Sequence, residues 1–367
     1  MPSDLALADL YNTTGGSSWS RQADWLNPQA TNWQGVSVAG GRVTALVLDN
    51  NHLIGAIPDS LGNLSQLQDL DLSGNRLVGG IPANLGNLTQ LSALSLFGNQ
   101  LTGGIPATLG SLTNLQYIAL SNNQLVGSIP ASIGNLSNLL ILYLFNNQLV
   151  GGIPASMGNL SNLQSLYLSN NQLSGSIPDS LGNLTQLHDL LVFGNQLVGG
   201  IPASLGNLTQ LQNLFLDRNQ LTGGIPASLG NLTQLQQLFL RENKLVGDVP
   251  DFKGFTHAYI DISDNYLNIA PGSQSLSNIN AMMAAGNTVN YLPQTPLPSL
   301  NILRSNAQAT LMWPASAASF VLEVSDTLST SPSWTAITNG ITTSGNNSVF
   351  TTDTAAPSAF YRLRKNQ

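Results

Sequence analysis

An asparagine that recurs every 24 residues constrains this chain more than any other feature of its sequence. A fixed apolar framework accompanies it, which around Asn219 includes Leu214, Leu216 and Leu221. A unit of this size cannot bury its apolar face alone and does so only against its neighbours. The period therefore predicts a solenoid of ten stacked units within residues 41–268, with a last interval of 22 residues. The asparagines are Asn51, Asn75, Asn99, Asn123, Asn147, Asn171, Asn195, Asn219, Asn243 and Asn265.

Within each unit, the residues before the asparagine alternate between apolar and variable positions. Leu214-x-Leu216 has the period of two that is typical of a short strand, with both leucines pointing inward. Beyond Asn219, Gly223 and Pro226 end any regular element. We expect the asparagine to turn inward too, because its amide both donates to and accepts from loop backbone that water cannot reach.

The repeated pattern LxxLxLxxNxLxGxIPxxLGNLxxL resembles that of the plant-type leucine-rich-repeat family, over about Val43 to Leu267. The resemblance implies an α/β solenoid that is curved and right-handed. It places a parallel β-sheet on the concave face and irregular or 3₁₀ segments behind the sheet. It also implies that protein–protein recognition is the most common role of such a chain.

Residues 1–40 are predicted to form an N-terminal cap over the first repeat. A short amphipathic helix is expected from Ser3 to Tyr11, with Ser3 as its N-cap. The segment NWQGVSV resembles the N-terminal cap of plant-type repeat proteins, in which a cysteine usually follows. Val38 stands at that position, and the chain has no cysteine. The cap is therefore expected to close by packing of Trp19, Trp25 and Trp33, as in bacterial relatives of the family.

Residues 269–298 are predicted to form a C-terminal cap and a linker, because the period ends and YLPQTPLP is punctuated by prolines. Short β-rich runs separated by turn residues fill residues 299–367 and predict a small all-β sandwich. This module resembles the fibronectin-like domains appended to secreted bacterial proteins. We therefore expect a bacterial protein that acts outside the cell or at its surface. The first ten residues lack the features of a signal peptide, so either a leader was removed or the protein is cytoplasmic.

Composition excludes several classes of function. Only 8% of residues are charged, against ~25% in typical soluble domains, and the net charge is −7. With 11 lysines and arginines in all, a nucleic-acid partner is not expected, because neutralising phosphates needs clustered basic residues. No apolar run is long enough to span a membrane. A monomer is expected.

Residues with catalytic or metal-binding chemistry are scarce and scattered. The three histidines, His52, His188 and His257, lie in different repeats, and the absence of cysteine excludes thiolate chemistry. Asp261 and Asp264 are more typical of a capping repeat than of a Ca²⁺ loop, which needs six or more oxygen ligands. We therefore expect no enzyme activity, no cofactor and no metal.

The residues six, four and two before each asparagine are predicted to point out of the concave sheet, and these are the positions that vary. Nine of the eighteen phenylalanines and tyrosines fall there. Because neighbouring strands lie about 4.8 Å apart, their rings should form a contiguous stripe. Such a stripe either shields the sheet by cross-strand packing or binds a ligand, and a monomer seldom exposes a large apolar patch without a partner. The candidate ligand-binding residues are Phe97, Tyr117, Tyr143, Phe145, Tyr167, Phe193, Phe215, Phe239, Arg241 and Tyr259.

We expect a non-enzymatic recognition protein that binds a protein or polysaccharide on this face. One alternative, implied by the family, is inhibition of a cell-wall-degrading enzyme such as a polygalacturonase. That role would favour a continuous acidic face, whereas acidic residues such as Asp69 and Asp71 are confined to its ends. A second alternative is ice binding, for which Thr89, Thr185 and Thr209 share one register, although serines interrupt it and it lies off the sheet.

Overall fold

The computed structural model describes residues 2–27, 33–252, 254–294, 300–305, 308–314, 320–326, 333–345, 347–353 and 359–365. The chain divides into two compact units, Met1–Thr295 and Pro296–Gln367. The first unit is a stack of repeats and the second is a small β module.

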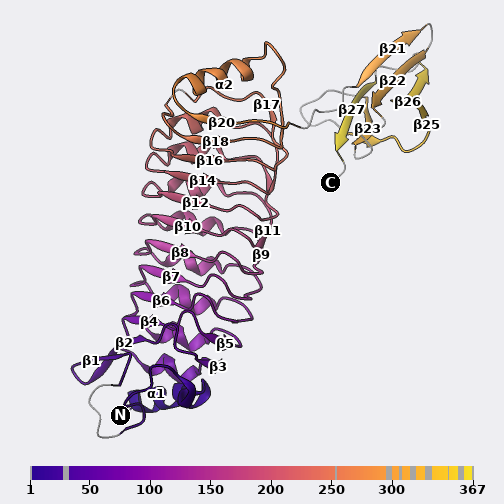
Figure 1. Cartoon of the computed structure of the whole chain (residues 1–367). Helices are drawn as coiled ribbons and strands as arrows, with labels where there is room; N and C mark the ends of the chain where they lie inside the picture. Colours follow the sequence, from indigo (N-terminus) through magenta and orange to yellow (C-terminus); the bar gives the residue numbers. More distant parts are fainter. Residues whose placement is uncertain are drawn as a thin grey trace. The chain divides into compact units, whose positions relative to one another are not determined.

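The first unit is built on a sheet of 12 strands, in which the repeats follow one another in sequence order (Figure 1). The first strand pairs antiparallel with the second, and every later pair is parallel. In sheet order the strands are β1 (Val36–Ala39), β2 (Arg42–Val47), β4 (Asp69–Asp71), β6 (Ala93–Ser95), β7 (Tyr117–Ala119), β8 (Ile141–Tyr143), β10 (Ser165–Tyr167), β12 (Asp189–Leu191), β14 (Asn213–Phe215), β16 (Gln237–Phe239), β18 (Tyr259–Asp261) and β20 (Thr288–Asn290). The predicted solenoid with a parallel sheet is confirmed.

Behind the sheet, the first eight of the ten repeats return through a 3₁₀ helix. These helices are η2 (Asp59–Asn63), η3 (Ala83–Asn87), η4 (Ala107–Ser111), η5 (Ala131–Asn135), η6 (Ala155–Asn159), η7 (Asp179–Asn183), η8 (Ala203–Asn207) and η9 (Ala227–Asn231). Short parallel pairs join neighbouring repeats after the asparagine: β3 (Ile54–Ala56) with β5 (Arg76–Val78), β9 (Val150–Gly151) with β11 (Gln172–Leu173), β13 (Val198–Gly199) with β15 (Gln220–Leu221), and β17 (Val246–Gly247) with β19 (Tyr266–Leu267).

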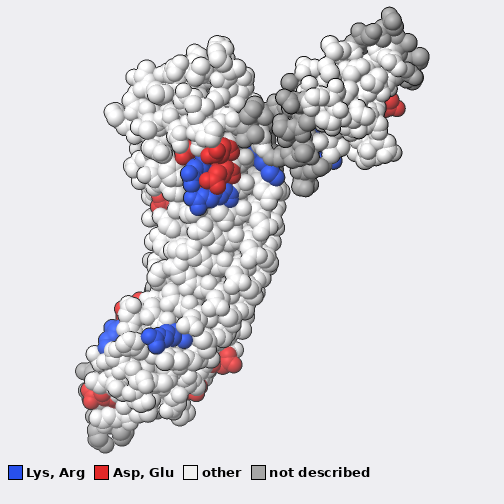
Figure 2. All heavy atoms as spheres, turned by 45° about the vertical axis from the view of Figure 1, so that its right-hand side comes forward, with Lys and Arg blue, Asp and Glu red and all other residues white. Residues whose placement is uncertain are grey.

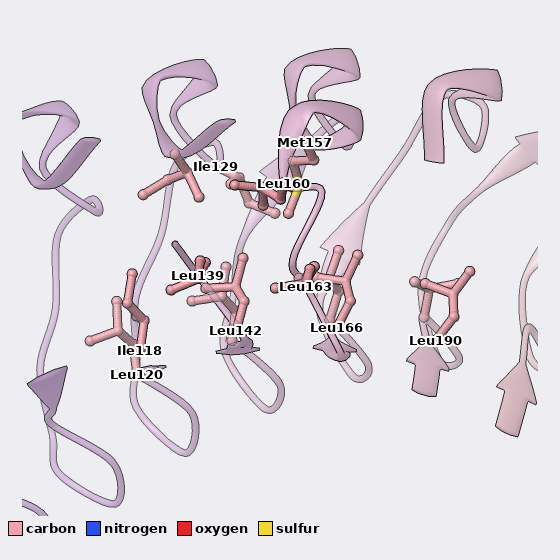
Figure 3. Close-up of a cluster of buried hydrophobic side chains, with 14 of the residues drawn as sticks. Ile118, Leu120, Ile129, Leu139, Leu142, Met157, Leu160, Leu163, Leu166 and Leu190 are labelled. Atoms are coloured by element: carbon pink, nitrogen blue, oxygen red, sulfur yellow. The ribbon is translucent and has the colours of Figure 1, made fainter. Parts of the chain in front are cut away.

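The core is a continuous column of leucines and isoleucines between the sheet and the 3₁₀ helices (Figure 3). Leu142 of β8 is fully buried and lies in register with Ile118 and Leu166 of the neighbouring strands. The 3₁₀ helices stack so closely that a Cβ on Gly134 would lie 2.3 Å from the carbonyl oxygen of Ser156. Glycine at this position therefore permits the close stacking of repeats.

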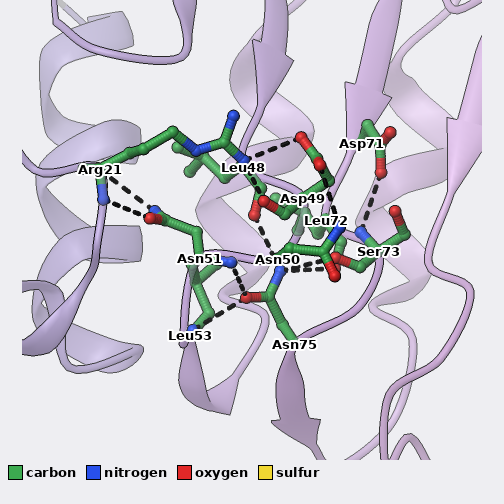
Figure 4. A network of polar contacts seen from close by, with 10 residues as sticks. All are labelled: Arg21, Leu48, Asp49, Asn50, Asn51, Leu53, Asp71, Leu72, Ser73 and Asn75. Atoms are coloured by element: carbon green, nitrogen blue, oxygen red, sulfur yellow. Dashed lines mark hydrogen bonds and ion pairs between the residues drawn. The ribbon is translucent and has the colours of Figure 1, made fainter.

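The repeated asparagines form a hydrogen-bonded ladder beneath the turns that follow the strands. The Asn75 Oδ1 atom accepts from the backbone N–H groups of Asn51 and Leu53, at 2.9 and 3.0 Å, and its Nδ2 donates to Leu48 and Leu72 at 2.8 and 2.9 Å (Figure 4). The predicted inward orientation is confirmed, and each of these side chains from Asn75 to Asn265 bonds both its own repeat and the preceding one.

The N-terminal end is covered by α1 (Pro2–Thr13), the 3₁₀ helix η1 (Gly16–Ser18) and a cluster of aromatic rings. Trp19 and Trp25 meet edge to face at 4.7 Å between centroids, and Trp25 lies 5.1 Å from Trp33. The expectation that Ser3 caps the helix is wrong, because the helix begins at Pro2. Proline is favoured at the first helical position, where its fixed φ suits the helix and its missing N–H is not needed.

The C-terminal end of the solenoid contains two elements that the period does not predict. These are α2 (Gln274–Ala284), capped by the side chain of Ser273, and β20, which adds one more parallel strand to the sheet. Ile279 and Met282 of α2 are buried against the core. The last apolar residues of the solenoid are therefore covered by a helix and a strand.

The second unit consists of two antiparallel sheets around a small core. One sheet contains β21 (Asn301–Ser305), β22 (Gln308–Pro314), β26 (Asn347–Asp353) and β25 (Ile341–Ser344), and the other contains β24 (Thr335–Ala336), β23 (Phe320–Ser325) and β27 (Phe360–Lys365). Leu311, Trp313 and Leu322 form the core, and buried Glu323 pairs with Arg362 and Arg364 at 2.8 and 2.5 Å. The predicted all-β module is confirmed.

A chain that ends at Gln294 is expected to keep the cooperative unfolding of the solenoid, because the two units have separate cores. Urea unfolding followed by circular dichroism, compared with the full chain, measures this. A lower midpoint for the shortened chain would show that the β module stabilises the repeats.

Candidate functional site: the outward face of the large sheet

The outward face of the twelve-stranded sheet, called the sheet face below, carries all ten candidate residues. The alternation of each strand places them there: in β8, Leu142 is buried, whereas Tyr143 points to the other side. Their side chains are less exposed than the sequence suggested. Phe97 and Tyr259 are exposed, at 38% and 41%, and the other eight are half-buried.

The aromatic side chains form two groups on this face. In the central cluster, defined as Phe97, Tyr117, Tyr143, Phe145 and Tyr167, the rings of Tyr143 and Tyr167 stack at 4.5 Å and the other contacts are 6.1–6.4 Å between centroids. In the C-terminal cluster, defined as Phe193, Phe215, Phe239 and Tyr259, Phe215 and Phe239 stack at 4.4 Å. Each cross-strand pair of this kind contributes about 0.2–1 kcal/mol to stability.

Small residues between the phenylalanines explain why the rings are only partly exposed. Phe97 and Phe145 occupy the same position two repeats apart, yet their centroids are only 6.4 Å apart. Between them lies Ser121, which is fully buried and whose Oγ has no hydrogen-bond partner among the described residues. The two rings therefore lean toward each other over the serine and cover it.

Asp189 of β12 organises the polar groups beside the central cluster. Its carboxylate accepts from Asn213 Nδ2 at 2.6 Å, from Ser165 Oγ at 3.1 Å and from the Tyr167 hydroxyl at 3.3 Å. Burial, together with the Asp189 charge, raises the pKa of Tyr167 well above its ordinary value. Tyr167 therefore stays a neutral donor whose orientation is fixed by the next strand.

A pocket of about 340 Å³, called the C-terminal pocket, opens beside the C-terminal cluster. Polar side chains line it together with the four rings of that cluster: Asp217, Arg218, Arg241 and Asp261. Arg241 was among the sequence candidates, and the other three were not. Their signal in the sequence is the gathering of charged residues in adjacent repeats of a chain that has few.

Asp217 is the most unusual group in this pocket. It is only 4% exposed, and its Oδ1 atom has no hydrogen-bond partner among the described residues. Its Oδ2 lies 3.7 Å from Arg218 Nε. Burial raises the pKa of the Asp217 carboxyl, and its interaction with its own backbone N–H, followed by the neighbouring Arg218 and Arg241 charges, partly offsets this effect.

The opposite end of the sheet face is acidic. Burial and the Asp71 charge raise the pKa of Asp69. Burial, then Tyr143 and Asp71, raise the pKa of Tyr117. Figure 2 shows charged side chains near both ends of the solenoid, with a nearly uncharged stretch between them on the face in view.

Groupings typical of other kinds of site are not found among the described residues. No three His, Asp or Glu side chains in that part of the chain lie close enough together to hold a metal ion. The helices that the structure describes are also too short or too polar to cross a membrane.

Comparison with known proteins identifies the family to which this repeat architecture belongs. A profile described as leucine rich repeat matches residues 41–101, and one described as leucine-rich repeat region matches residues 105–251. No curated protein shows significant sequence similarity to the chain.

Solved structures share the fold. The ectodomain of the plant membrane receptor kinase GASSHO1/SCHENGEN3 from Arabidopsis thaliana, in complex with CASPARIAN STRIP INTEGRITY FACTOR 2, is 40% identical with a TM-score of 0.70, over 72% of this chain and 33% of that one. The Arabidopsis receptor kinase HAESA, in complex with the peptide hormone IDA and the co-receptor SERK1, is 34% identical with a TM-score of 0.65, over 72% and 46%. A plant ice-binding protein is 26% identical with a TM-score of 0.63, over 80% and 97%.

The chain thus spans between a third and a half of the two receptor ectodomains, and nearly all of the ice-binding protein. The repeat pattern, the parallel sheet with its inward asparagines, and these matches agree. The chain is a leucine-rich-repeat protein, and its solenoid is of the plant type.

Proposed function

We propose that this chain is a non-enzymatic recognition protein whose sheet face binds a protein or peptide ligand. The observation that carries the proposal is the central cluster, in which five aromatic rings from four consecutive repeats lie together on one face. Rigid aromatic side chains supply much contact area at low entropic cost and dominate many interfaces. The similar receptor ectodomains, one captured with a peptide hormone, support this choice over a polysaccharide ligand.

We infer that the protein acts outside the cell or at its surface, as a monomer, and that it comes from a bacterium. The likeness to ectodomains supports an extracellular role. The β module then serves as a fibronectin-like spacer or attachment domain, which is consistent with its two small antiparallel sheets.

The double substitution Tyr143→Ala with Phe145→Ala tests the proposal. A protein and glycan array probed with the intact chain identifies the ligand, and the variant is expected to lose its binding. Truncating a central aromatic anchor typically costs ~2 kcal/mol or more of binding energy. The melting temperature should change by only a few degrees, because both rings are half-buried rather than in the core.

The exposed Val150→Ala variant serves as a control that removes apolar surface outside the sheet face. If the double variant binds its array ligand normally, or melts many degrees lower than the native chain, the stripe is a shield. The binding surface would then lie behind the sheet or on the β module.

A second candidate function, ice binding, is favoured by one specific surface. Eight hydroxyl residues share one register behind the sheet, and all are exposed: Ser65, Thr89, Thr113, Ser137, Ser161, Thr185, Thr209 and Thr233. The likeness to a plant ice-binding protein supports this candidate. A measurement of thermal hysteresis with the intact chain decides it, because a value of zero excludes an ice-binding role.

Inhibition of a polygalacturonase ranks lower. Blocking a basic enzyme cleft would need a continuous acidic face, since complementary charge is what steers such partners together. The middle of this sheet face is aromatic, and the carboxylate of Asp189 beside the central cluster is held by three donors.

A further inference from the structure

The C-terminal pocket contains a buried carboxylate oxygen without a donor. Asp217 Oδ1 has no partner among the described residues, although two arginines line the same pocket. A buried carboxylate normally attracts any nearby guanidinium group, because a charge-assisted hydrogen bond offsets the cost of taking the charge out of water. The arrangement therefore needs an explanation.

Glu242 supplies the explanation, because it engages both arginines. Its Oε1 lies 3.3 Å from Arg241 NH2 and 3.7 Å from Arg218 Nε. Arg218 lies equally far, 3.7 Å, from Asp217 Oδ2. The carboxylate of Glu242 thus competes with Asp217 for the guanidinium groups, and Asp217 Oδ1 is left without a partner among the described residues.

The backbone at these positions is unfavourable for the residues that occupy it. The residue before each repeated asparagine has a positive φ, which is 53° at Asn122 and Asn146 and 65° at Gly74. Most repeats place asparagine or glycine there, the residues that tolerate this region. Arg218 and Glu242 adopt it at 50° and 53°. Strain of this kind is concentrated at functional sites.

The charges of the pocket favour a cation. Its surroundings contain the carboxylates of Asp217, Asp261 and Glu242 and the guanidinium groups of Arg218 and Arg241, with a net charge of −1. Asp261 is satisfied by Ser263 Oγ at 2.7 Å and Asn290 Nδ2 at 3.1 Å, so Asp217 is the acceptor that remains. An anionic ligand would have to displace Glu242 from both arginines.

We propose that the C-terminal pocket binds a lysine or arginine side chain of a protein or peptide ligand. The cationic group donates to Asp217 Oδ1, and its aliphatic stem packs against Phe215 and Phe239. Glu242 is a positioning residue that keeps the acceptor free. Oδ1 is covered in the present arrangement, so binding includes a shift of the Arg218 or Arg241 side chains, which are 50% and 33% exposed. This inference rests on the proposed use of the sheet face for protein recognition.

Calorimetric titration of the full chain with capped dipeptides tests the proposal. The probes are acetyl-Phe-Arg-amide, acetyl-Phe-Lys-amide, the uncharged acetyl-Phe-norleucine-amide, and acetyl-Phe-norleucine with a free carboxylate. Both cationic probes are expected to bind at least tenfold more tightly than the uncharged one. Asp217→Asn should abolish that preference, because a neutral amide does not attract the cation.

A second variant tests whether Glu242 positions the arginines or only stabilises the fold. Glu242→Asn places asparagine where four other repeats carry it, so the melting temperature should stay the same or rise. Affinity for the cationic probes should nevertheless fall severalfold, because the released arginines turn to Asp217. Asp264→Asn, at the equivalent position of the next repeat and outside the pocket lining, is the matched charge control and should change neither quantity.

Three results overturn the proposal: no saturable heat with any cationic probe, equal binding of the uncharged probe, or tighter binding of the free carboxylate. The last result would show that the arginines bind an anion. None of these results affects the proposed recognition function. That function fails only if the array ligand binds the aromatic double variant as tightly as the native chain.

Discussion

Replacing Leu142 with alanine is expected to lower the free energy of unfolding by about 2–5 kcal/mol. Leu142 is fully buried, and its neighbours in the sheet, Ile118 and Leu166, come from adjacent repeats (Figure 3). The substitution leaves a cavity that could close only if both flanking repeats shifted. The hydrogen bonds of the parallel sheet hold these repeats in register. Urea unfolding followed by circular dichroism measures the loss.

Val150→Ala is the matched control, because it removes apolar atoms from a side chain that is 42% exposed. Its effect should stay within about 0.5 kcal/mol. At temperatures below its own melting temperature, the Leu142→Ala variant should still bind the ligand. The aromatic double variant should show the opposite pattern, with binding lost and the melting temperature little changed. A loss under about 1 kcal/mol would mean that the repeats can close the cavity.

Replacing Asn147 with alanine is expected to cost roughly 1–3 kcal/mol, because buried backbone groups lose their partners. Its Oδ1 accepts from the Leu125 N–H at 3.0 Å, and its Nδ2 donates to the carbonyls of Leu120 and Leu144, both at 3.1 Å. Water cannot replace these bonds without entering the stack. Denaturant unfolding gives the cost, and hydrogen exchange at the Leu125 amide should accelerate.

Gln148→Ala is the control in the same turn, since that side chain is exposed and its loss should change stability by less than about 0.5 kcal/mol. If Asn147→Ala unfolds at the same denaturant concentration as the native chain, the ladder contributes little to stability despite its hydrogen bonds.

The regular part of the fold could be predicted from the sequence because one period determines many contacts. The alternation around Leu214 and Leu216 identified the strand and its faces, and the invariant amide of Asn219 identified the inward turn. Both are local patterns repeated ten times, so each unit supports the same interpretation of the others. The placement of the aromatic residues on one face followed directly from them.

Features that depend on side-chain packing or on a single copy could not be predicted in this way. The elements α2 and β20 occur once, at a spacing that the period does not contain. The partial burial of Phe97 and Phe145 depends on how their rings lean over Ser121. The unpaired oxygen of Asp217 depends on which carboxylate the two arginine side chains contact, and a sequence does not specify side-chain conformations.

The ladder of asparagines also bears on how such a chain can change length. Because each amide makes the same bonds to the preceding unit, removing a whole 24-residue unit rejoins two equivalent surfaces. The outward residues of the new neighbours, however, are not equivalent. Deleting residues 168–191 would place Tyr167 of one segment next to Phe215 of the other. Unequal crossing-over between repeats therefore shuffles ready-made combinations of surface residues without redesigning the scaffold, and the same operation offers a laboratory route to new specificities.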